Sequence, residues 1–257
     1  MSKPTQVLNE AAIREKQIVA GLFLSKFDKA GLETLGFSGF TEAFNAIGFA
    51  LGAKPASIKN YRDEFDPVFS SRRKGWHKRP LRAYCKAVGE RYKHLSLSEF
   101  STLVKSLTYS AGALDILGEK ADDTTTSESS FAKRLITGLA AENYFESVHP
   151  SLPTLQDYKL ENVSRMGCGF DFKLSRNAKP DFLAVEVKGL NESRGTLSLT
   201  EKEHRVAGLL KERFFLFVVR NFRESPFHDI YSNPLNSKLV FARQEKRVVQ
   251  VSWSLSI

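Results

Sequence analysis

The sequence predicts an all-α N-terminal region followed by an α/β (α+β) domain. Before about residue 107, apolar residues recur at helical spacing. Residues 121–130 are polar and rich in Ser and Thr, which is typical of a linker. After Pro153, alternating and continuous apolar runs indicate strands. We therefore expect a helical domain over 1–120, a linker over 121–130 and an α/β domain over 131–257.

Local signals delimit the helices expected in the N-terminal region. Pro67 stops the third of them, because proline lacks the backbone N–H that a helix needs. Ser96 or Ser98 can act as the N-cap of the fifth. The five predicted helices cover residues 11–27, 41–51, 54–65, 80–92 and 96–107.

The second and third helices have the outline of a helix-turn-helix over residues 41–66. A small-residue helix ends at Gly52, and Pro55 stands at the start of the next helix, where its missing N–H is harmless. Ile58 is expected to pack inward. The outward polar residues are then candidates for DNA contact: Lys54, Ser57, Lys59, Asn60 and Arg62. The alternative is an ordinary pair of packed helices.

A basic stretch over residues 72–93 follows, with Glu90 as its only acid. Clustered cations neutralise phosphates, and Trp76 offers a ring that can stack on a base. The formal net charge of +9 and the pI of about 9.5 favour a polyanionic partner, either nucleic acid or an anionic membrane surface. A solvated charged face is the alternative. The candidate contacts here are Arg72, Arg73, Lys74, Trp76, His77, Lys78 and Arg79.

Several classes of protein are disfavoured by what the sequence lacks. It contains no apolar run of transmembrane length and no secretory signal, so we expect a cytoplasmic protein without a membrane partner. Cys85 and Cys168 lack zinc-site spacing and are expected to be reduced thiols. There is no phosphate-binding Gly-x-x-x-x-Gly-Lys-Ser/Thr loop, so the activity should not depend on ATP.

The second domain is predicted to alternate helices and strands. A helix over 131–145 precedes two alternating strands, 170–174 and 182–188, which are joined by a turn around Pro180. A helix over 200–210 leads to the apolar run 214–219, which is typical of a buried central strand. Two further strands are expected over 238–242 and 247–255.

The strongest chemical signal lies in these strands. Glu186 and Lys188 are two residues apart on one strand, so both side chains lie on the same face. If the hairpin turn is centred near 178–179, antiparallel pairing places Asp171 opposite Glu186. Two carboxylates and a lysine then converge. The alternative is a solvated sheet face with a cross-strand ion pair.

This arrangement suits metal-assisted phosphodiester hydrolysis. Carboxylates provide the hard oxygen ligands that Mg²⁺ prefers, and Mn²⁺ can substitute for it. Asp171 and Glu186 are the expected metal ligands, and the metal polarises the phosphate and lowers the pKa of a bound water. Lys188 can position that water or stabilise the developing negative charge.

The order of these motifs resembles the PD-(D/E)XK nuclease superfamily, and more narrowly the branch named for the C-terminal domain of the NO VEIN protein. The resemblance covers residues 131–221 and rests on Gly-Phe-Asp171, Val-Glu186-Val-Lys188-Gly and Leu-Thr200-x-x-Glu203. It implies a restriction-endonuclease-like core with a mixed central sheet. It also implies metal binding by Asp171 and Glu186, a further catalytic glutamate at Glu142, and a polar residue at Glu203.

The Pro180-Asp181 pair departs from the pattern that the superfamily name implies. It precedes Glu186 by only five residues, which is roughly 16 Å along a strand and an odd offset that points Asp181 to the opposite face. We therefore assign the catalytic aspartate to Asp171 and interpret Pro180-Asp181 as part of the turn.

The function expected from these observations is that of a Mg²⁺-dependent, ATP-independent restriction-type endonuclease, in a prokaryotic cytoplasm, acting on a specific sequence in double-stranded DNA. A homodimer is expected because cutting both strands needs two active sites or a rearrangement, and a cognate DNA methyltransferase is a further expected partner. Two alternatives remain: a non-catalytic DNA-binding regulator with a nuclease-like module, and a structure-specific repair or recombination nuclease.

Overall fold

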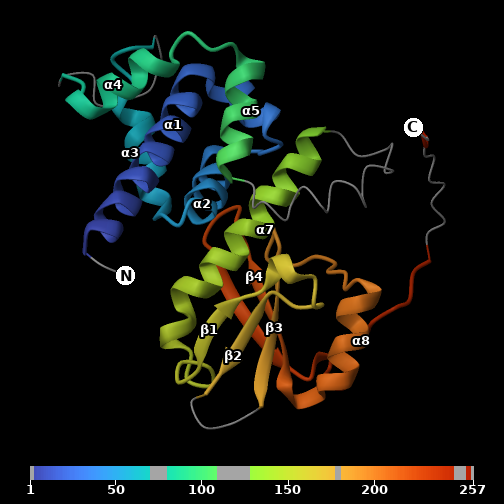
Figure 1. The fold of residues 1–257 in the computed structure, drawn as a ribbon. Coiled ribbons are helices and arrows are strands. Elements are labelled where there is room, and N and C mark those ends of the chain that lie inside the picture. The colour runs from blue at the N-terminus through green and yellow to red at the C-terminus, as the bar shows by residue number, and fades with distance from the viewer. Residues whose placement is uncertain (1–2, 70–79, 109–127, 177–180, 246–252, 256–257) are drawn as a thin grey trace.

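The computed structural model describes residues 3–69, 80–108, 128–176, 181–245 and 253–255. Its N-terminal part is helical, and its C-terminal part is a mixed sheet with helices on both faces (Figure 1). This order confirms the predicted fold class.

The N-terminal helices pack around α1, which is in contact with α2, α3, α4 and α5. Ser96 is the N-cap of α5, because its hydroxyl accepts from Glu99 N–H while the Glu99 carboxylate accepts from Ser96 N–H. The first predicted helix is longer than expected at both ends. The helices are α1 (Lys3–Thr34), α2 (Phe40–Ala50), α3 (Pro55–Glu64), α4 (Ala83–Tyr92) and α5 (Leu97–Thr108).

The turn between α2 and α3 forms as the sequence predicts. Gly52 takes the left-handed conformation (φ 63°) just past the end of α2, where glycine is favoured. A Cβ on Gly48 would lie 2.9 Å from Pro55 Cα, so only glycine allows the start of α3 to approach α2 this closely. Ile58 is fully buried, as expected of the inward residue of α3.

The sheet has the strand order β1-β2-β3-β4-β5 in the described part of the chain. The β3–β4 pair is parallel and the other pairs are antiparallel. Parallel neighbours need a crossover connection, and α8 (Glu201–Leu210) lies in it. The strands are β1 (Lys159–Asn162), β2 (Phe172–Ser175), β3 (Phe182–Gly189), β4 (Phe214–Arg220) and β5 (Phe227–Ser232).

Helices cover the two faces of the sheet. The face with Val185 and Val187 packs against α7 (Glu128–Val148), whereas Ala184 on the opposite face packs with Ala207 of α8. Alternate residues of β3 therefore point to different helices. Short 3₁₀ turns complete the architecture: η1 (His149–Ser151), η2 (Ser164–Met166), η3 (Lys211–Arg213) and η4 (Pro234–Asn236).

The largest apolar cluster joins the two parts of the chain. It contains Phe23 of α1 and Ile47 of α2 together with Phe145 of α7 and Val185 of β3. Most of the predicted linker lies outside the described residues, but 128–130 already belong to α7. The helical region and the sheet therefore share one core.

Two strand predictions need correction. Residues 238–242 form no strand, and Val240 is 96% exposed because no described strand lies beside it to pair with. Of the predicted strand 247–255, only 253–255 are described, and they form no strand either. The outer strands are instead β1 and β5, which the sequence pattern did not predict. None of the described helices is long and apolar enough to cross a membrane.

Candidate active site

Glu186 and Lys188 form the centre of a charged cluster on β3. Both side chains point to the α8 face, and Lys188 Nζ lies 2.5 Å from Glu186 Oε1. The Glu186 side chain is almost completely buried, and Lys188 is largely buried. A buried ion pair is costly unless each group is satisfied by further partners, so the surroundings of this pair decide its role.

Asp171 joins the cluster from the position immediately before β2. The β2–β3 ladder begins at the Phe172–Val185 pair, and the Asp171 N–H donates to Val185 O at 3.0 Å. The Asp171 side chain accepts a hydrogen bond from the Val187 N–H at 2.8 Å through Oδ2. This bond holds the carboxylate beside β3.

Glu203 holds Lys188 from the other side. Its Oε2 lies 2.9 Å from Lys188 Nζ and also accepts from the Thr200 N–H at 2.9 Å, while the Thr200 hydroxyl accepts from the Glu203 N–H. Thr200 and Glu203 thus form the capping box that starts α8. The sequence singled out Glu203, but its contact with Lys188 emerges only from the packing of α8 on the sheet.

Glu142 reaches the cluster from α7. Burial, followed by the nearby negative charge of Asp171, raises the pKa of Glu142 to about 8. A hydrogen bond from Ser164 to Glu142 and the charge of Lys188 act in the opposite direction. The predicted fourth acidic residue therefore shares the electrostatic environment of Asp171.

The electrostatics of the cluster show an excess of negative charge. Burial, opposed by the Val187 hydrogen bond and Lys188, raises the pKa of Asp171 to about 6. Burial and the charge of Asp171 raise the pKa of Glu186 well above its usual range. Burial alone lowers the pKa of Lys188, but Glu186 and Glu203 outweigh it and raise that pKa overall. The Lys188 ammonium contacts Glu186 and Glu203, and Asp171 and Glu142 act on the cluster through their charge, so the acids are stabilised by any additional cation or by protons.

The donor set suits a hard divalent cation, although the side chains are not arranged around one. Asp171, just before β2, and Glu186 of β3 offer carboxylate oxygens, which is the chemistry that Mg²⁺ prefers. Among the described residues, no three His, Cys, Asp or Glu side chains converge closely enough to coordinate one ion as they stand. Instead the Lys188 ammonium contacts Glu186.

The candidate DNA-contacting residues of α3 differ in exposure. Lys54, Lys59 and Asn60 are exposed and Ser57 is half-buried, although Lys59 also pairs with Asp63 at 2.7 Å. Arg62 departs from the expected exposure. Its guanidinium lies 3.9 Å from the centre of the Phe40 ring, so it packs on α2.

The basic stretch and the turn are described only in part. Residues 72–79, which contain Arg72, Arg73, Lys74, Trp76, His77, Lys78 and Arg79, lie outside the described residues. So does Pro180. Asp181 is exposed and 3.4 Å from Arg213, away from the cluster.

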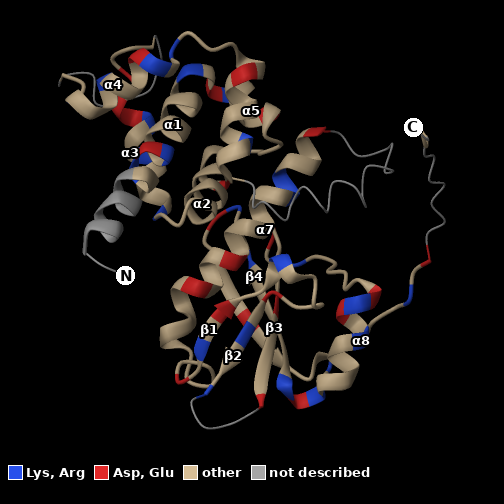
Figure 2. Cartoon of the chain, viewed as in Figure 1, with Lys and Arg blue, Asp and Glu red and all other residues tan. Residues whose placement is uncertain are grey.

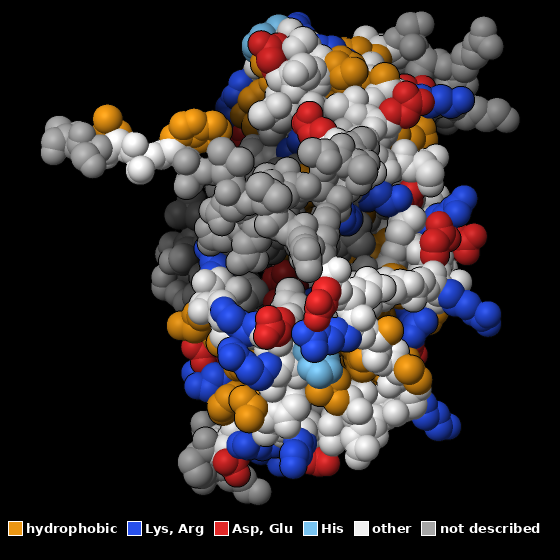
Figure 3. Space-filling view, turned by 90° about the vertical axis from the view of Figure 1, so that its right-hand side faces the viewer, with side chains coloured by type: hydrophobic (Ala, Val, Ile, Leu, Met, Phe, Trp, Pro, Cys, Tyr) orange, Lys and Arg blue, Asp and Glu red, His pale blue; other side chains and the backbone are white. Residues whose placement is uncertain are grey.

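Figure 2 shows acidic as well as basic positions on α3, α4 and α5, and Figure 3 shows a similar mixture on the side of the molecule that carries α8.

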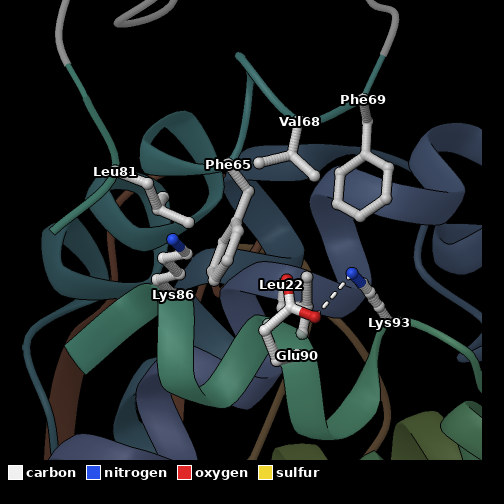
Figure 4. Close-up of a pocket in the computed structure, with 9 residues that line it drawn as sticks. Leu22, Phe65, Val68, Phe69, Leu81, Lys86, Glu90 and Lys93 are labelled. Atoms are coloured by element: carbon white, nitrogen blue, oxygen red, sulfur yellow. Dashed lines mark ion pairs between the residues drawn. The ribbon is translucent and has the colours of Figure 1, made fainter. Parts of the chain in front are cut away.

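A small hollow in the helical part is separate from the cluster (Figure 4). Apolar side chains that include Phe65 and Phe69 form its wall, and Lys86 and Lys93 lie at its rim. Lys93 pairs with Glu90 at 2.6 Å. None of the four clustered carboxylates lines this hollow.

The fold and the cluster together define an α/β protein with a carboxylate–lysine centre on adjacent strands of a mixed sheet. Residues 142–231 match the model of the family described as Protein NO VEIN, C-terminal. The matched segment begins at Glu142, ends in β5 and includes Asp171, Glu186, Lys188 and Glu203. This confirms the predicted resemblance to the C-terminal domain of the NO VEIN protein. No curated protein and no solved structure matches the chain.

Proposed function

We propose that this chain is a Mg²⁺-dependent, ATP-independent endodeoxyribonuclease of restriction type, with a core of the PD-(D/E)XK kind. The observation that carries the proposal is the placement of Asp171, just before β2, beside Glu186 and Lys188 of β3, with Glu203 holding the lysine. The match to the NO VEIN C-terminal family supports it, because the matched segment contains the whole cluster.

Each residue has a distinct role in the proposed reaction. Asp171 and Glu186 would hold Mg²⁺, which polarises the phosphate and lowers the pKa of a water molecule. Lys188 donates hydrogen bonds to that water or to a phosphate oxygen and neutralises developing charge. Glu142 shares the charge environment of Asp171, and because its pKa is raised to about 8 it holds a proton at neutral pH that it can donate.

The test of the proposal is DNA cleavage with and without metal. Plasmid and phage DNA, both modified and unmodified, are incubated with the protein in Mg²⁺, Mn²⁺ or EDTA. We expect discrete fragments in either metal and none in EDTA. The variants Lys188→Ala and Asp171→Asn should reduce the rate by about 10²-fold or more, because each loses a group that acts in the transition state.

The matched control for these variants is Glu161→Gln, which changes an exposed carboxylate on β1. It should cut like the parent protein. If the parent shifts DNA in a gel but cuts none in either metal, the nuclease proposal fails and the non-catalytic DNA-binding regulator replaces it. If the positions of cleavage were set by DNA junctions or flaps rather than by a sequence, the structure-specific repair nuclease would be favoured.

Glu203 is proposed as a positioning residue for Lys188. Glu203→Gln keeps an oxygen for the capping box but removes the charge that faces the ammonium. We expect a cleavage rate lower by about 10-fold and an alkaline limb of the pH–rate profile that moves to lower pH, because the pKa of Lys188 loses one of the charges that raise it. A lower rate with an unchanged profile would assign Glu203 to helix capping alone.

The exposed face of α3 is proposed to contact double-stranded DNA. Lys54→Ala should weaken binding in EDTA on every duplex and reduce the slope of log affinity against log salt by about 1. Asn60→Ala should instead weaken binding to the cognate sequence only, by about 1–3 kcal/mol. The control is Lys159→Ala, which removes an exposed charge on β1. Equal effects of Lys54→Ala and Lys159→Ala would show that α3 has no special role.

The proposal also includes the assembly and setting of the protein. Cutting both strands of a duplex needs two active sites or a rearrangement, so a homodimer on DNA is proposed. A restriction activity in a prokaryotic cytoplasm would be accompanied by a cognate methyltransferase that protects the host DNA.

A further inference from the structure

The helix that carries Glu142 is bonded directly to the helix-turn-helix pair. Asn143, the next residue on α7, donates from Nδ2 to Phe49 O at 2.9 Å and to Ala50 O at 3.0 Å. These carbonyls belong to the last turn of α2, where Phe49 O also accepts from the Gly52 N–H at 2.9 Å. A side chain of the core therefore caps the first helix of the pair.

A second asparagine makes the reciprocal contact. Asn45 of α2 donates from Nδ2 to Phe222 O at 2.8 Å and to Glu224 O at 2.9 Å, both just after β4. Its side chain is buried, so these two bonds are shielded from water. Leaving such groups without partners in the interior costs far more than an exposed hydrogen bond contributes.

The rest of the α2–α7 contact is apolar and ionic. The Phe49 ring packs edge-on against Tyr144 with centroids 5.1 Å apart. Near the beginning of α2, the buried carboxylate of Glu42 pairs with Lys133 of α7. Bonds at both ends and packing between them oppose rotation or sliding of α2 along α7.

The same elements lead directly to the candidate active site. Ala141 packs against Gly189, the residue after Lys188, where an added Cβ would meet Thr137 O of α7 at 2.9 Å. On the other side, α3 approaches α2 through Gly48 and Pro55. An unbroken chain of close contacts therefore runs from α3 through α2 and α7 to β3.

We infer that Asn45 and Asn143 are positioning residues that lock the DNA-contacting helix pair to the cleavage centre, so that the enzyme cuts at a fixed distance from the DNA segment bound by α3. This rests on the proposed nuclease function. It excludes the arrangement in which a tethered nuclease domain cuts at variable distances from its recognition site.

The first test measures the coupling without any cleavage. Spin labels are placed at Ala56→Cys on α3 and Glu201→Cys on α8, both exposed positions, in a Cys168→Ser background. Pulsed dipolar spectroscopy should give one narrow distance distribution for this protein. Adding Asn45→Asp and Asn143→Asp, which place carboxylates against carbonyl oxygens, should broaden it. A broad distribution in the parent, or no broadening in the double variant, would overturn the inference even if the nuclease proposal holds.

The second test maps the cut positions on an end-labelled duplex. The parent protein should cut at one offset, and the double variant should cut at several offsets around it, with at least a several-fold loss of the main product. Phe100→Leu, a core change in α5 outside the α2–α7 contact, should keep the single offset despite its lower stability. Variable offsets in the parent contradict the inference. An absence of cutting together with a narrow spin-label distance would refute the nuclease alone and leave the rigid connection intact.

Discussion

Glu186→Gln is expected to abolish cleavage while making the protein more stable. Glu186 is 3% exposed, and burial together with the charge of Asp171 makes its ionised form unfavourable. Glutamine has nearly the same shape and still offers Lys188 an oxygen, but it carries no charge to desolvate. The carboxylate that the proposed reaction needs is therefore one whose charge lowers the stability of the folded protein.

The magnitudes of the two effects differ. Loss of a metal-binding carboxylate should reduce the cleavage rate by about 10³-fold or more. At pH 7.5 in EDTA, the unfolding free energy should rise by about 1 kcal/mol, which for a chain of this size moves the unfolding midpoint by about 2–4 °C. Calorimetry and the cleavage assay on one preparation measure both quantities.

Glu161→Gln is the control for this prediction because it also removes one carboxylate, from an exposed site on β1. It should change neither cleavage nor stability. If Glu186→Gln lowered the unfolding midpoint instead, the Glu186–Lys188 pair would be a stabilising structural ion pair, and the interpretation of the cluster as a strained functional site would be wrong.

The sequence predicted the centre of the site because the relevant signals are local. The two-residue period of a strand fixes the common face of Glu186 and Lys188, and the hairpin connection brings Asp171, just before β2, beside them. The cap at Thr200 is likewise encoded within one helical turn. Each of these follows from residues close together in the chain.

The features that were missed depend on packing between distant segments. β1 has mostly exposed residues, and β5 has mostly half-buried ones, so neither shows a clear apolar period. They form strands because β1 pairs with the outer edge of β2 and β5 pairs with the outer edge of β4. Conversely, the apolar run at 238–242 finds no partner strand in the described chain. The contact of Asn143 with α2 joins residues more than ninety positions apart and has no local signature.

The carboxylate cluster should make the metal-free protein less stable as the pH rises, and Mg²⁺ should reverse this loss. The folded protein retains the Glu142 proton up to about pH 8, whereas the unfolded chain releases it near 4.5. The resulting stabilisation is complete below pH 4.5 and disappears as the pH rises through 8. Glu186, whose pKa is also raised, contributes with the same sign.

The informative window is pH 6.5–8.5. Burial lowers the pKa of His149 and of His228, so these histidines oppose the trend only below their ordinary value of 6.5. Within the window, the unfolding free energy in EDTA should fall by about 1–2 kcal/mol, allowing for the partial exposure of Glu142 to solvent. Glu142→Gln should flatten this slope, and Glu161→Gln should not.

Mg²⁺ should stabilise the protein more at pH 8 than at pH 6.5, because a metal ion and protons compete for the same carboxylates. The difference should be lost in Asp171→Asn and Glu186→Gln, which remove the proposed ligands. Thermal unfolding monitors this binding without any DNA. If the unfolding free energy in EDTA did not change between pH 6.5 and 8.5, the electrostatic account of the cluster would be refuted. If the unfolding free energy fell steeply with pH and Mg²⁺ did not change this, the carboxylates would carry unfavourable charge but bind no metal. The role of the cluster would then lie in proton transfer rather than in metal-assisted hydrolysis.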